Sequence, residues 1–280
     1  MRFFSIMLLL IFPLGLTGQK DTVIYYSGLG RSLGYDSTAH YYERITKKTR
    51  KKYLSTTYTR QNEKWIMLYE TTINKETDSS VTIISKSLIN PKITRIFYKN
   101  AGGYFIKDYL GSVLIEEGFS RLIFPIIKYG QWRGYDHTTG GLKTDEIYSD
   151  NQLITNRYWI NNSEYIDNVF YMADKVAEYK GGDDALMSFI SEHARYPKYA
   201  FNNNISGTVI IRFIVLKNGA VEGVELLKKV NRFLDMEALR VGKLIPDIWN
   251  PGEIGDNKVN MLIAVPVIFQ INKNVVIENQ

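Results

Sequence analysis

The segment that decides the fold of the C-terminal part of the chain spans residues 208–226 and reads TVIIRFIVLKNGAVEGVEL. Its first half alternates, so that Val209, Ile211 and Phe213 share one face of an extended strand. The Asn-Gly pair at 218–219 then provides the positive-φ residues of a tight turn. The segment therefore predicts a β-hairpin with one apolar face.

Helical periodicity flanks this hairpin on both sides. One helix is predicted before the hairpin and one after it, and Pro197 and Pro246 mark their ends. The apolar residues of each helix recur three or four positions apart: Leu186, Phe189 and Ile190 in the first helix, and Leu234, Ala238 and Val241 in the second.

A final strand is predicted from Asn260 to Ile271. Its apolar residues alternate strictly: Met261, Ile263, Val265, Val267, Phe269 and Ile271. Pro266 falls inside this strand and has no N–H to donate, so the strand should lie at a sheet edge or contain a bulge. The resulting order is α-β-β-α-β, with two helices on one face of a small antiparallel sheet.

This order of elements, together with its glycines and prolines, resembles the C-terminal domain of TonB, the protein that links an inner-membrane motor to outer-membrane transporters. The matching positions are Gly181-Gly182, Tyr196-Pro197, Gly207, Asn218-Gly219, Leu234-Asp235 with Glu237-Ala238-Leu239-Arg240, Pro246, Trp249 with Pro251-Gly252, and Pro266-Val267 with Phe269.

The resemblance implies a binding protein that requires no catalytic residue. No metal and no cofactor are expected, since His40, His137 and His193 are widely spaced and form no ligand motif. TonB-like domains bind an extended segment near the N-terminus of an outer-membrane transporter, which adds as a strand to an exposed sheet edge. The predicted docking edge is the last strand, with the turns at 196–197 and 249–252 shaping its surroundings. The candidate partner-binding residues are Asn260, Met261, Leu262, Ile263, Ala264, Val265, Val267, Phe269, Tyr196 and Trp249.

The N-terminal region, residues 19–178, is predicted to be a mostly antiparallel β domain, and the whole chain an α+β protein. This region is rich in Tyr, Thr, Ile and Trp and is divided into short runs by Gly, Asn and Asp. An aromatic strand followed by a turn recurs at Phe97–Gly102, Tyr129–Trp132 and Tyr148–Leu153, which resembles degenerate MORN-like repeats. An irregular β-sheet domain explains the recurrence as well. The TonB-like domain is predicted to follow at residues 179–280.

The first 18 residues have the features of a secretory signal. Arg2 precedes an apolar run from Phe3 to Leu16, and small residues follow at Thr17 and Gly18. The alternative is an uncleaved inner-membrane anchor, although the run is shorter than the roughly 20 residues that a spanning helix needs. Either reading predicts a location in the periplasm or cell envelope, and an anchor would also allow contact with inner-membrane motor proteins.

Two features separate this chain from the familiar transducer. The N-terminal apolar segment is short, and no long Pro-rich spacer precedes the C-terminal domain. The alternative function is therefore a periplasmic scaffolding protein that has no transporter partner.

Composition and isolated motifs give little support to other functions. The chain has 280 residues, a net charge of +6 and no cysteine, which excludes disulfides and thiol chemistry. Gly30-Arg31-Ser32-Leu33-Gly34 matches a nucleophile elbow but lacks the strands that must precede one. The basic run from Lys47 to Lys52 is typical of a solvated turn, with contact to lipid or nucleic-acid phosphate as the alternative. For an exported chain, a nucleic-acid partner is not expected.

Overall fold

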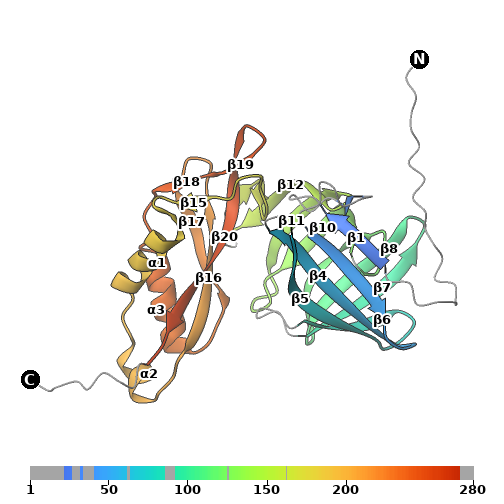
Figure 1. Ribbon diagram of the computed structural model, residues 1–280, viewed down its shortest axis with the longest axis horizontal. Coiled ribbons are helices and arrows are strands. Elements are labelled where there is room, and N and C mark those ends of the chain that lie inside the picture. Colours follow the sequence, from blue (N-terminus) through green and yellow to red (C-terminus); the bar gives the residue numbers. More distant parts are fainter. Residues whose placement is uncertain are drawn as a thin grey trace, which may run out of the picture.

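The computed structural model describes residues 22–26, 32–33, 41–61, 64–85, 92–124, 126–161 and 163–271 of the chain. These residues form a thirteen-stranded sheet and, beside it, a smaller domain of helices and strands (Figure 1). The predicted α+β class is confirmed. The proposed signal at 1–18, most of the Gly30–Gly34 motif and residues 272–280 lie outside the described residues.

The N-terminal sheet is an antiparallel meander. From β3 to β13 each strand pairs with the next one in sequence, and β1 and β2 extend the sheet beyond β3. The strands are β1 (Thr22–Tyr26), β2 (Ser32–Leu33), β3 (Tyr41–Lys47), β4 (Lys52–Gln61), β5 (Lys64–Lys75), β6 (Ser80–Ser85), β7 (Ile93–Asn100), β8 (Gly103–Leu110), β9 (Val113–Ser120), β10 (Lys128–Tyr135), β11 (Leu142–Ser149), β12 (Gln152–Trp159) and β13 (Tyr165–Asp167).

The sheet curls, so that distant strands share one core. Ile73 of β5, Phe97 of β7 and Trp132 of β10 belong to the same buried cluster, which a flat sheet could not bring together. A glycine makes room for the largest of these side chains, because a Cβ at Gly118 would lie 2.3 Å from the Trp132 indole. The indole N–H donates to the carbonyl of Phe119 at 2.6 Å.

Charged side chains are also buried in this sheet. Arg95 of β7 pairs with Asp108 of β8 through two hydrogen bonds of 2.8 and 2.7 Å, and it donates a third to the carbonyl of Ile123 at 2.7 Å. Both side chains of the pair are at least nine-tenths buried. The interior of the N-terminal sheet is therefore held together by polar contacts as well as apolar ones.

The MORN-like interpretation placed turns at three recurring sites, and one of them is a strand. Residues 129–132 lie inside β10, where Gly130 has a φ of 63° at a shift in the pairing register with β9. The other two sites are hairpin turns, between β7 and β8 and between β11 and β12. Gly130 thus serves a bulge, which is the other common use of glycine within a strand.

The C-terminal domain has the predicted α-β-β-α-β order, with a short extra helix. Its elements are α1 (Gly182–His193), α2 (Lys198–Asn202), β16 (Gly207–Val215), β17 (Val221–Lys228), α3 (Arg232–Gly242), β18 (Trp249–Asn250), β19 (Gly252–Ile254) and β20 (Asn257–Phe269). Two short strands that begin before position 179 also contribute: β14 (Val169–Phe170) pairs with β20 in parallel, and β15 (Glu178–Tyr179) pairs with β18.

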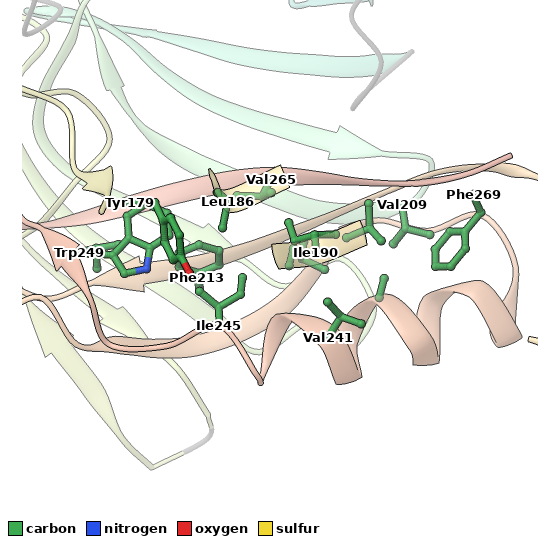
Figure 2. Packing of buried hydrophobic residues seen from close by; sticks show 14 of the residues in the cluster. Tyr179, Leu186, Ile190, Val209, Phe213, Val241, Ile245, Trp249, Val265 and Phe269 are labelled. Carbon is green, nitrogen blue, oxygen red and sulfur yellow. The ribbon is translucent and has the colours of Figure 1, made fainter. Parts of the chain in front are cut away.

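The core of this domain lies between the sheet and its helices. Figure 2 shows Val209 and Phe213 of β16 in a cluster with Val241 of α3 and Ile190 of α1. All four side chains are buried. In Figure 1, α1 and α3 lie on the side of the C-terminal sheet that faces away from the N-terminal sheet. No helix among the described residues is both long and apolar enough to cross a bilayer.

The two regions meet at a partly buried charge. Glu225 of β17 accepts hydrogen bonds from Tyr158 of β12 at 2.6 Å, from Lys143 of β11 at 2.7 Å and from Arg212 of β16 at 2.7 Å. Burial favours the neutral carboxyl, but the charge of Arg212 and these hydrogen bonds outweigh it and hold the pKa of Glu225 below its ordinary value. Beside this network, Tyr158 and Ile214 share an apolar cluster. The N-terminal sheet is thereby fixed to the C-terminal sheet.

Candidate partner-binding edge

The predicted docking strand, β20, is paired continuously with β16 from Met261 to Phe269, whereas most of its other side is unpaired. Its ladder with β16 runs from Gly207 opposite Phe269 to Val215 opposite Met261, without a register shift. On its other side, β14 pairs with residues 260–261. The hairpin partner β19 pairs with residues 257–259, before the ladder with β16 begins. From Leu262 to Phe269, no strand in the described part of the chain pairs with this outer side.

Pro266 reveals which backbone groups face the open side. Because the ladder with β16 continues unbroken past it, the nitrogen that lacks a hydrogen must point away from β16. The direction of backbone groups alternates along a strand, so the N–H and C=O groups of Leu262, Ala264 and Ile268 point outward as well. Of the two options that the sequence left for Pro266, the structure therefore selects the sheet edge without a bulge.

The side chains of β20 divide between two surfaces. Val265, Val267 and Phe269 are buried in the core beneath the helices. Ala264 and Ile268 are exposed on the opposite face, and the Ile268 side chain is 52% exposed. Of the predicted binding residues, those with odd numbers from 261 to 269 therefore build the domain, and Ala264 is exposed at the open edge. Leu262 packs against the cluster of Tyr158 and Ile214, and Asn260 is paired with Val169 of β14.

The opposite edge of the sheet, strand β17, is less suited to receive a strand. Its pairing with β16 is interrupted by two register shifts, and Gly223 within it has a φ of 64°. A Cβ at this position would lie 2.7 Å from Ile160 of the N-terminal region. Bulges of this kind twist an edge and interrupt its row of donors and acceptors, which protects it from added strands.

Tyr196 supports one end of the predicted edge. Its hydroxyl donates to the carbonyl of Ile205 at 2.7 Å, and its ring packs edge-on against Phe269 with centroids 5.7 Å apart. These contacts hold the segment between α1 and α2 beneath the last residue of β20. The role of Tyr196 in the structure is thus to fix the end of the strand.

Trp249 lies in the core of the domain rather than on the predicted binding surface. Its ring is buried between Tyr179 and Phe213, with centroids 5.4 Å from each. The indole N–H is buried and has no hydrogen-bond partner in the described structure. The contribution of β15 to this aromatic cluster was missed in the sequence, because Glu178-Tyr179 is too short to show any periodicity.

Ser32 of the motif that resembles a nucleophile elbow and His193 are placed apart from this edge. Ser32 lies in the short strand β2, which pairs with β1. The His193 ring nitrogen Nδ1 lies 2.8 Å from the carbonyl of Phe189 on the surface of α1. Across the described ranges, no three histidine, aspartate or glutamate side chains gather in a way that could hold a metal ion.

Comparison with known proteins defines the class of this domain. Residues 192–271 match a protein family described as the Gram-negative bacterial TonB protein C-terminal. The match begins at the end of α1 and runs past β20, so it contains the whole predicted docking edge. The chain therefore carries a TonB C-terminal domain, and the match supports a TonB-like envelope protein.

The remaining comparisons add no relatives. No curated protein and no solved structure matches the chain. The resemblance of the N-terminal region to MORN repeats finds no support among the family matches, which cover only the C-terminal domain.

Proposed function

We propose that this exported protein binds an extended segment of an outer-membrane transporter by strand addition along residues 262–269 of β20. The observation that carries the proposal is the one-sided pairing of β20, which leaves a straight outer edge without a bulge. Such an edge supplies affinity through main-chain hydrogen bonds and needs no catalytic group. The match to the TonB C-terminal family supports a transporter as the source of the partner segment.

The backbone directions make the proposal specific. An added strand would find donors and acceptors at Ala264 and Ile268, but at Pro266 only an acceptor. The exposed side chains of Ala264 and Ile268 would lie beside those of the partner on the face away from the helices. We therefore expect sequence-tolerant binding in which main-chain pairing provides most of the affinity.

The test removes a single outward donor. Ala264→Pro eliminates an N–H that β16 does not use, at an exposed position in extended backbone, and Pro266 shows that the strand accepts proline in this orientation. We expect the variant to keep its fold and to bind transporter-derived peptides about tenfold more weakly, since a net hydrogen bond is worth roughly 0.5–1.5 kcal/mol. Ala264→Val keeps the N–H and serves as the matched control.

The measurement is fluorescence anisotropy with labelled peptides from the N-terminal extensions of outer-membrane transporters and the chain from residue 19 onward. Equal affinity of the two Ala264 variants would show that the edge does not pair with the peptide. Absence of binding to every peptide by the folded wild-type protein, with crosslinking in cells only to other envelope proteins, would favour the scaffolding function instead.

A further inference from the structure

The basic run that the sequence placed in a turn forms the tip of the hairpin between β3 and β4. Five of its six residues are cationic: Lys47, Lys48, Arg50, Lys51 and Lys52. All six residues are exposed. None of the five cations forms an ion pair within the described parts of the chain, whereas nearby Lys75 pairs with Asp78 at 2.7 Å and Arg121 with Asp150 at 2.7 Å.

The tip is structured rather than an open loop. The Thr49 hydroxyl oxygen accepts hydrogen bonds from the backbone N–H groups of Lys51 and Lys52 at 3.2 and 3.1 Å. The N–H groups of Lys48 and Thr49 both donate to the Lys52 carbonyl, at 2.9 and 3.1 Å. Five positive charges are therefore held on one short turn, although like charges this close repel one another. A folded tip that keeps such repulsion is suited to an anionic partner.

The chemistry of the tip favours a surface of phosphates over nucleic acid. Binding of single strands uses exposed aromatic rings on which bases stack. The aromatic residue next to the tip, Tyr53, packs instead against Phe124 of the segment between β9 and β10, with centroids 5.2 Å apart. The tip thus offers charge without a stacking surface, which matches lipid headgroups.

We propose that this hairpin tip binds the anionic, phosphate-bearing surface of a lipid bilayer. The inference rests on the envelope location within the proposed function, but not on strand addition at β20. A negative result for peptide binding therefore leaves membrane binding open, and the reverse also holds. Clusters of four to eight Lys or Arg bind anionic bilayers, and each charge strengthens binding roughly fivefold.

The test measures co-sedimentation of the chain from residue 19 onward with vesicles of phosphatidylcholine alone or with 30% phosphatidylglycerol, a composition chosen as roughly that of an anionic membrane. We expect binding only to the anionic vesicles, and its loss at about 1 M salt, where the screening length falls to about 3 Å. Lys48→Gln, Arg50→Gln and Lys51→Gln together should weaken it about a hundredfold.

The matched control changes net charge equally at a distance from the tip. Lys198→Gln, Lys229→Gln and Lys243→Gln remove three exposed cations of the C-terminal domain and should leave binding within about twofold, since charges beyond the Debye length of about 8 Å contribute little. An equal loss in both triple variants would reduce the effect to net charge and overturn the proposal. So would unchanged binding of the tip variant.

Two further arms define the ligand and the role of the turn. Inorganic phosphate should compete no better than chloride at equal ionic strength, and stronger competition would show a site for single phosphates in place of a bilayer surface.

Thr49→Val keeps every charge but removes the hydroxyl that fixes Lys51 and Lys52, and we expect about fivefold weaker binding. Binding equal to wild type would contradict the role of the ordered turn.

Discussion

The two regions of this protein are held together by different interactions. The C-terminal domain has an apolar cluster that joins both long helices, β16 and β20. The N-terminal sheet has a smaller apolar cluster, and the buried Arg95–Asp108 pair lies close by. Apolar contacts depend on volume and area, whereas a buried ion pair depends on both of its partners. Single substitutions should therefore destabilise the two regions for different physical reasons.

The largest effect is expected in the apolar core. Phe213→Ala deletes a fully buried ring that packs against Trp249 and should cost about 4 kcal/mol, within the range for buried Phe→Ala changes. Hydrogen exchange resolved by peptide fragments should show protection lost throughout residues 182–269. Ile268→Ala, at an exposed position of the neighbouring strand, is the control and should cost less than about 0.5 kcal/mol. Similar protection in both variants would contradict the assignment of Phe213 to the core.

A somewhat smaller effect is expected from breaking the buried ion pair. Asp108→Asn leaves the Arg95 charge buried without its counter-charge and should cost about 3 kcal/mol. Joint replacement by Arg95→Met and Asp108→Leu should recover most of that loss, because an apolar pair of similar volume carries no desolvation cost. Urea unfolding followed by tryptophan fluorescence measures both variants. A double variant as unstable as the single one would show that the N-terminal sheet needs the polar pair itself.

The smallest of the three effects concerns the joint between the regions. Glu225→Gln weakens charge-assisted hydrogen bonds from Lys143 and Arg212 and should cost about 2 kcal/mol. The pKa of Glu225 is lowered on folding, so its contribution is complete above the ordinary value of 4.5 and is lost as the pH falls through the lower folded value. The difference between wild type and variant should therefore shrink below about pH 4. A difference in stability that stays constant from pH 7 to pH 3 would show that the charge of Glu225 does not stabilise the joint.

The sequence allowed the C-terminal domain to be predicted almost element by element. Its strands alternate and its helices repeat because each has one face in the same apolar core, as Phe213 and Val241 show. The outer side of β20 was also anticipated, since Pro266 excludes a fully paired strand. The binding residues themselves stay a prediction.

The N-terminal sheet was predicted only in outline, for physical reasons. Strands β9 and β10 contain Gly118, Gly130 and Gly134, and glycine in a sequence usually indicates a turn. In the structure, Gly118 makes space for Trp132 and Gly130 forms a bulge. Buried polar residues such as Asn156 further obscure the alternation. The contact between Glu225 and Tyr158 joins residues 67 positions apart, so no local sequence pattern predicts it.

The short parallel strand β14 gives the open edge of β20 two unlike ends. At Asn260 and Met261 the edge is already occupied by Val169 and Phe170, so an added segment cannot slide in that direction. At Phe269 no such barrier is present among the described strands. The edge therefore has a register stop at one end only. Under the proposed strand addition, a partner segment extended toward Phe269 would meet no paired strand of the described chain, whereas residues added at the other end would have to turn away from the sheet.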